Sequence, residues 1–267
     1  MSRRITVAVA PTGGWGRGSN NPVTPEAIAA DVAASAKAGA SVLHLHSRDS
    51  NGELSRSREP FDMAVRLIDE RCDIVLEAST GGLSDFTAQE RVRPIDNPRA
   101  EMGSLNIGSL NFGDEVYRNS MVDVRYWIER MKDANVKPSL EVFDTGHLEA
   151  GLHLVDEGLV REPVYFSFIF GVKWGMAYSR QLLEYLIGRV PRGSRWGFTM
   201  VGSRDFGPHR EAAALGASIV RTGFEDTREY NGKTAGSNAE LVAQLCSELA
   251  DDGLKLADPA HTRTVLG

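Results

Sequence analysis

Two histidines separated by one residue, His44 and His46, are the side chains best suited to chemistry. They lie in the apolar run 41–46, which predicts a β-strand, and residues i and i+2 of a strand project from the same face. Both imidazoles therefore point one way, with Leu43 and Leu45 on the opposite face. Imidazole is a common zinc ligand, so the pair predicts half of a metal site. The alternative is a pair of hydrogen-bonded core histidines.

A third ligand is expected from the segment RTGFED, which begins at Arg221 and ends with Glu225 and Asp226. Two histidines and one carboxylate with open coordination positions suit catalytic Zn²⁺, and also Fe²⁺ or Mn²⁺. The alternative for the two acids is a solvated loop or a helix N-terminus, where negative charge is favourable. Spacing alone leaves both interpretations open.

Further polar side chains lie within or directly after other apolar runs. They are Ser79, Thr80, Ser104, Asn106 and Glu141. A carboxylate within a strand must be paired or hydrogen-bonded, and Arg221 is a candidate partner for Glu141. A purely structural ion pair is the alternative.

The elements that must position these residues alternate between short apolar runs and longer amphipathic ones. The predicted strands are 5–10, 41–46, 74–78, 102–106, 139–143, 164–169, 196–201 and 218–222. The predicted helices begin with one capped by Thr24 and ended by Gly39, continue with 61–70, 122–135, 147–157, 181–187, 209–215 and 239–251, and include a short one near Ala88. Eight strand–helix units predict an α/β fold, and favour a single (β/α)8 TIM barrel over residues 1–267 over the alternative of an open doubly wound sheet. Its chemistry belongs at the C-terminal ends of the strands.

Composition narrows the classes of function. The 267 residues carry a formal charge of −6, which argues against a nucleic-acid binder. No apolar run approaches 18 residues, so no membrane span is expected. Two cysteines fit a reducing compartment, and a cytoplasmic location is expected. Four other histidines are interpreted as surface or helix-capping residues: His147, His153, His209 and His261.

The chain resembles the β-keto acid cleavage enzyme family along nearly its whole length. The matching segments are 22–26, 38–40, 44–48, 79–82, 104–106, 111–113, 141–143, 221–226 and 237–242. Each segment alone is weak evidence for the family, but all of them together and in this order are specific to it. The position of Ser104 holds threonine in the family pattern, a change that keeps the hydroxyl.

The resemblance implies a Zn²⁺-dependent barrel that exchanges acyl groups between a β-keto acid and acetyl-CoA, giving acetoacetate and a new acyl-CoA. It implies that His44, His46 and Glu225 are the zinc ligands. It also implies that Asp226 is the general base, oriented by Arg221 and Glu141. Ser79, Thr80, Ser104 and Asn106 are expected to line the substrate site, and a homo-oligomer, with a tetramer suspected, is expected.

Trp15 bears on the choice of substrate. It falls where an amine-cleaving member of the family has an acidic residue after the first strand. An indole offers apolar contact or a cation–π face, so we expect a β-keto acid with an uncharged apolar or aromatic tail, or a trimethylammonium tail.

The residues leave two other functions open as alternatives to acyl exchange with acetyl-CoA. A metal-dependent aldolase or hydrolase would not need CoA, and a non-catalytic ligand-binding barrel would not need a metal.

Overall fold

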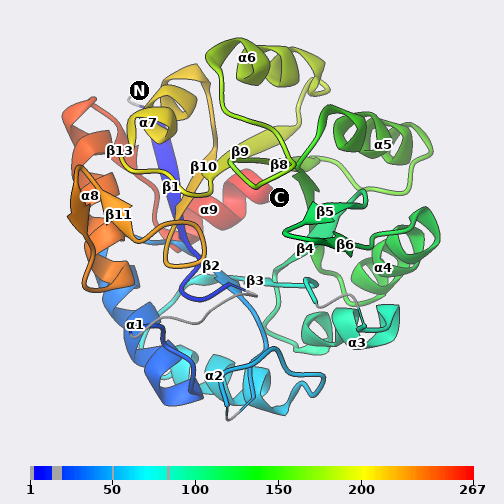
Figure 1. Ribbon diagram of the computed structural model, residues 1–267, viewed down its shortest axis with the longest axis horizontal. Helices are drawn as coiled ribbons and strands as arrows, with labels where there is room; N and C mark the ends of the chain where they lie inside the picture. The colour runs from blue at the N-terminus through cyan, green and yellow to red at the C-terminus, as the bar shows by residue number, and fades with distance from the viewer. Residues whose placement is uncertain (1–2, 14–19, 50, 83–84) are drawn as a thin grey trace.

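The computed structural model describes residues 3–13, 20–49, 51–82 and 85–267. Eight parallel strands form a closed barrel, because β10 pairs back with β1 (Figure 1). In order around the barrel they are β1 (Arg4–Val9), β2 (Val42–Leu45), β3 (Val75–Ala78), β4 (Met102–Asn106), β7 (Lys137–Val142), β8 (Tyr165–Phe170), β9 (Arg195–Met200) and β10 (Ile219–Thr222). The predicted single-domain (β/α)8 barrel is confirmed.

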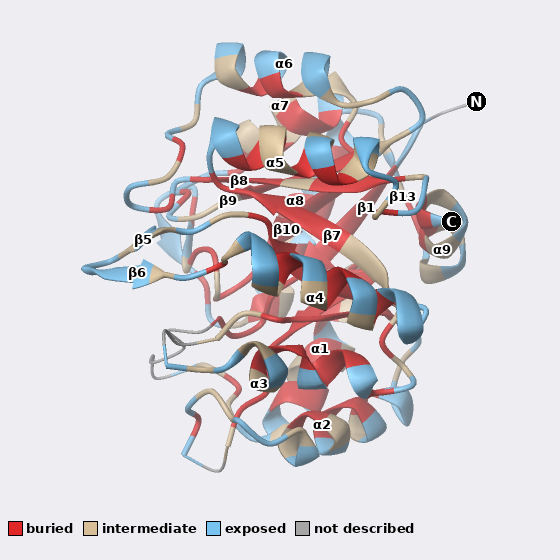
Figure 2. Cartoon of the chain, turned by 90° about the vertical axis from the view of Figure 1, so that its right-hand side faces the viewer, coloured by how far each residue is buried: buried red, intermediate tan, exposed pale blue. Residues whose placement is uncertain are grey.

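Helices surround the barrel and expose their outer faces, while the strands are buried (Figure 2). They are α1 (Pro25–Ala38), α2 (Glu59–Asp69), α3 (Ala88–Val92), α4 (Met121–Asp133), α5 (Thr145–Asp156), α6 (Arg180–Arg189), α7 (Gly207–Leu215) and α8 (Asn238–Asp251), with a 3₁₀ turn at Arg93–Asp96. The Thr24 hydroxyl caps α1 by accepting from the Ala27 amide, and Gly39 ends it at φ 120°. Both ends were predicted.

Two hairpins decorate the end of the barrel at which the strands finish. One is β5 (Leu110–Phe112) with β6 (Glu115–Tyr117), and the other is β11 (Glu229–Tyr230) with β12 (Lys233–Thr234). The β5–β6 hairpin projects at the opposite end from the C-terminus (Figure 2). Neither hairpin was predicted, because each strand has only two or three residues and lacks a readable alternation.

The opposite end of the barrel is closed by α9 (Pro259–Leu266), which follows the short strand β13 (Lys255–Leu256). Leu266 packs inside the barrel against side chains from six strands, namely Ala8, Val42, Val75, Met102, Tyr165 and Ile219. The Thr262 hydroxyl lies 3.0 Å from that of Thr6. One end of the barrel is therefore sealed, and ligands must enter at the other.

Two histidines differ from the prediction of surface or capping positions. His147 and His209 are buried, with 7% and 1% of their surface exposed. His209 Nε2 lies 3.1 Å from the carbonyl of Arg221, and His147 Nδ1 accepts from the Phe143 amide at 3.3 Å. The sequence predicts surface positions for both because a histidine does not contribute to the apolar periodicity that marks the buried face of a helix.

Within the described ranges, the structure contains no helix long and apolar enough to cross a membrane.

Candidate active site

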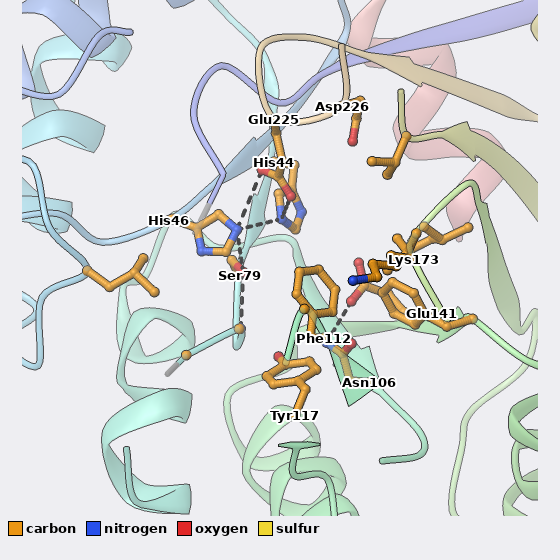
Figure 3. Close-up of a pocket in the computed structure, with 18 of the residues that line it drawn as sticks. His44, His46, Ser79, Asn106, Phe112, Tyr117, Glu141, Lys173, Glu225 and Asp226 are labelled. Carbon is orange, nitrogen blue, oxygen red and sulfur yellow. Dashed lines mark hydrogen bonds and ion pairs between the residues drawn. The ribbon is translucent and has the colours of Figure 1, made fainter. Parts of the chain in front are cut away.

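His44, His46 and Glu225 meet at the open end of the barrel (Figure 3). The Nε2 atoms of the two histidines are 3.3 Å apart, and they lie 3.6 Å (His44) and 3.5 Å (His46) from the carboxylate oxygens of Glu225. His44 and His46 are buried, and Glu225 is partly buried. His44 lies on β2 and His46 directly follows its last residue, and both side chains point inward as the sequence predicts.

The spacing of these atoms fits a metal ion. A tetrahedral zinc site with bonds of about 2.0–2.1 Å separates its ligand atoms by about 3.3–3.4 Å, close to the distances found here. His46 Nδ1 and Glu225 Oε2 are buried and have no hydrogen-bond partner among the described residues. Burial would lower the pKa of His44, but Glu225 and Glu77 outweigh it and raise the pKa to about 9. The pocket thus favours positive charge.

Glu77 is a site residue that the sequence analysis missed. Its Oε2 lies 2.7 Å from His44 Nδ1, and β2 and β3 are in register so that the two residues are side by side. Because the Nδ1 proton is shared with this carboxylate, Nε2 is the atom that would exchange its proton for a metal ion. The signal that could have found it is a lone carboxylate in the apolar strand VLEA, next to the histidine strand.

Arg221 and Asp226 form a buried ion pair beside the three candidate ligands. Arg221 donates from Nε to Asp226 at 3.0 Å and from Nη2 at 2.6 Å, and a further bond of 3.3 Å reaches Glu225. Burial raises the pKa of Asp226 to about 6, while Arg221 limits the rise. The carboxylate form therefore predominates at neutral pH, and Arg221 holds it in place.

The loop after β10 brings Glu225 and Asp226 back over the open end of the barrel, because the chain turns sharply at Gly223. Its φ is 142°, and an added Cβ would lie 2.2 Å from the carbonyl oxygen of Ala10. Asn238, fully buried at the start of α8, accepts from the Phe224 amide at 2.7 Å and donates to the carbonyl of Pro11. This side chain joins the loops that follow β10 and β1.

Glu141 and Asn106 face the same cavity from β7 and β4. They occupy paired register positions, and Asn106 Nδ2 donates to Glu141 at 2.6 Å. Arg221, the candidate partner of Glu141, instead donates its hydrogen bonds to Asp226 and Glu225. Burial raises the pKa of Glu141 to about 7, so this carboxyl exchanges a proton near neutral pH.

The remaining predicted residues divide into two groups. Ser79 lines the cavity, with its Oγ 3.2 Å from His46 Nε2. Thr80 and Ser104 are fully buried and bond to each other, the Thr80 hydroxyl donating to the Ser104 carbonyl at 2.5 Å. Neither is among the described residues that line the cavity. Trp15 lies outside the described residues.

The cavity has a volume of about 360 Å³, within the range of small-molecule sites. Phe112, Tyr117 and Lys173 line it and were not predicted, because the β5–β6 hairpin and the loop after β8 carry them. Arg91 fixes the hairpin by donating to the Tyr117 hydroxyl at 2.8 Å, and Trp174 Nε1 donates to the Gly113 carbonyl at 2.9 Å.

A family model described as beta-keto acid cleavage enzyme matches residues 4–267. The chain belongs to the β-keto acid cleavage enzyme family. It is 35% identical to the 3-keto-5-aminohexanoate cleavage enzyme of Acetoanaerobium sticklandii, over 93% of this chain and 91% of the relative.

Other relatives differ in the substrate that their names give. The 3-dehydrocarnitine:acetyl-CoA trimethylamine transferase of Rhizobium meliloti is 30% identical, over 100% of this chain and 97% of the relative. The fold is similar to that of ObcA, solved in a ternary complex with a C4-CoA adduct and oxalate, with a TM-score of 0.80 at 20% identity. That match covers 95% of this chain and 68% of ObcA.

Proposed function

We propose that this protein is a zinc-dependent β-keto acid cleavage enzyme that uses acetyl-CoA as its second substrate. The observation that carries the proposal is the convergence of His44, His46 and Glu225 beside the Arg221–Asp226 pair, in a member of this family. Three relatives whose names include acetyl-CoA as a reactant support the choice of co-substrate.

Zinc would be held by His44 and His46 through Nε2 and by a carboxylate oxygen of Glu225. Bound there, it would supply Lewis acidity for a substrate that carries both a carboxylate and a keto group. Glu77 keeps His44 in the tautomer that such binding requires.

Asp226 removes a proton from C2 of the β-keto acid, between the two carbonyl groups. Each of its oxygens accepts from Arg221 and retains a second lone pair for the proton. Ser79 and Asn106 offer a hydroxyl and an amide to the substrate oxygens. Arg221 is a positioning residue, which keeps Asp226 ionised and aimed at the cavity.

The proposed exchange conserves atoms and charge. The C2 carbanion attacks the acetyl carbonyl of acetyl-CoA and releases the CoA thiolate. The thiolate then attacks the original keto carbon, and the bond from that carbon to C2 breaks. The products are a new acyl-CoA and the carbanion of acetoacetate, which takes the proton back from Asp226.

A panel of β-keto acids tests this function, with acetoacetate and acyl-CoA followed by mass spectrometry with and without acetyl-CoA. We expect acetoacetate and an acyl-CoA whose acyl chain is two carbons shorter than the β-keto acid. The two products should form in equal amounts and only when acetyl-CoA is present. Cleavage that proceeds equally well without acetyl-CoA would instead identify a metal-dependent aldolase or hydrolase. The homo-oligomeric state and its suspected tetramer stay predictions.

A further inference from the structure

The cavity has two chemically different sides. The polar residues that would hold the reacting end of the substrate come mainly from β2, β3, β4 and β10. The other side is an apolar wall, defined as Phe112, Phe143, Ile169, Val172 and Val201, all of which line the cavity. Four of these residues come from the ends of β7, β8 and β9 or the loops after them, across the barrel from β2.

The apolar wall is a packed surface and not a set of isolated side chains. Phe143, Ile169 and Val172 form a buried cluster of their own, separate from the main core, and Phe112 and Val201 pack against it. Phe143 follows Glu141 by two residues, so the wall lies on the same face as this carboxyl and nearer the mouth. A substrate whose keto acid end reaches the polar side would place its tail along the wall.

Besides Glu141, which lies deeper in the cavity, the charged side chains on this side lie at its mouth. Lys173 Nζ lies 3.8 Å from Asp114 and 4.9 Å from the centre of the Trp174 ring, and 64% of the Lys173 side chain is exposed. Glu115 is also exposed. Both are exposed to solvent, whereas a charged tail on the wall would lose its water without gaining a hydrogen bond from the five wall residues.

We infer that the apolar wall binds the tail of the substrate and selects β-keto acids whose tail is an uncharged hydrocarbon chain. The inference rests on the proposed function. Of the two classes of tail expected from Trp15, the apolar wall favours the uncharged one.

The first test compares kcat/KM for straight-chain 3-oxo acids with that for matched charged substrates, all with acetyl-CoA. The charged set is 3-oxoadipate, 3-keto-5-aminohexanoate and 3-dehydrocarnitine. We expect a gain of about fourfold to tenfold for each methylene that the wall covers, and at least about tenfold preference for 3-oxohexanoate over each charged substrate. A higher kcat/KM for any charged tail would overturn the inference.

Two variants locate the effect at the wall. Val201→Asp should reduce the preference for 3-oxohexanoate over 3-keto-5-aminohexanoate by at least about tenfold, since the new carboxylate faces the tail. Val122→Asp is the matched control, because Val122 is 79% exposed on α4 outside the cavity. Phe112→Ala, on the hairpin, should reduce the chain-length gain without adding charge. Unchanged ratios in both wall variants would contradict the inference.

A titration of 3-oxooctanoate and 3-oxoadipate without acetyl-CoA separates this inference from the proposed function. If no acetoacetate forms with any substrate, the proposed function fails. The wall still predicts tighter binding of the uncharged chain, and tighter binding of the dicarboxylate would refute it.

Discussion

Glu225 and Asp226 are neighbours in the chain and both contact Arg221, but only Glu225 also faces the two imidazoles, and this difference supports the separate roles proposed for them. Glu225 faces both imidazoles, and burial, which would raise its pKa, is outweighed by His44 and Arg221, so the pKa stays well below its usual range. Asp226 is held through both oxygens by Arg221 and has a pKa of about 6. The first carboxylate suits a ligand, and the second suits a base that works near neutral pH.

Asp226→Asn should therefore lower kcat by about 10²–10⁴, because the amide keeps the shape but cannot accept the proton. Metal content should stay at the wild-type level, since Asp226 is not among the three proposed ligands. Steady-state kinetics and elemental analysis measure both, with the exposed Asp251→Asn as control. Near-normal turnover would move the role of base to another group, with Glu141 next in line.

Glu77→Gln should weaken zinc binding by about 10- to 100-fold, the usual cost of losing the carboxylate behind a metal-binding histidine. Competition with a chromophoric chelator measures the affinity, and Glu70→Gln on the surface is the matched control. If the variant holds zinc as tightly as wild type, His44 does not depend on this hydrogen bond.

At the scale of elements, the site residues at the ends of strands could be predicted from the sequence, whereas those that depend on contacts between distant segments could not. The period of two in the second strand correctly placed both histidines inward, and the eighth strand correctly carried its acids to the same rim. Glu77 was missed because its partner His44 is 33 residues away and only strand register reveals it. The β5–β6 hairpin was not predicted because its strands are too short to show a pattern. Its position at the cavity depends on the hydrogen bond between Tyr117 and Arg91, which lies 26 residues earlier in the chain.

His209 on α7 makes stability depend on pH. Burial lowers its pKa to about 4, so between pH 6.5 and 4 the unfolded chain binds a proton that the folded protein does not. Its contribution to stability is present above pH 6.5 and is lost on acidification, by about 2 kcal/mol between pH 7 and pH 5.

His209→Gln keeps a donor for the Arg221 carbonyl but cannot titrate, so its unfolding free energy should fall less between these two pH values than that of wild type. Urea denaturation at pH 7 and pH 5 gives the difference. Equal pH dependence of the two proteins would show that His209 does not stay neutral in the folded state.

At the scale of the whole molecule, the eight-unit pattern was sufficient to predict the closed barrel and the end at which the candidate site residues meet. The seal at the other end was not foreseen, because the eight residues of α9 give too short a window for periodicity. What fixes α9 is tertiary packing, with Leu266 buried among the inward side chains of the strands.

Leu266→Ala should lower the unfolding free energy by about 2–5 kcal/mol, since it leaves a cavity where the barrel interior is closed. Urea denaturation measures this, and Val122→Ala on the exposed face of α4 is expected to change stability by less than about 0.5 kcal/mol. Equal stability of the Leu266 variant and wild type would show that α9 does not seal the barrel.

The central claim is that His44, His46 and Glu225 hold a zinc ion at the open end of this barrel. Its most direct test is the metal content of protein purified without chelators, measured by inductively coupled plasma mass spectrometry. We predict about one zinc per chain in wild type. We predict loss of zinc in the His44→Ala/His46→Ala double variant, with the fold checked by circular dichroism. Full metal content in the folded double variant would contradict the account.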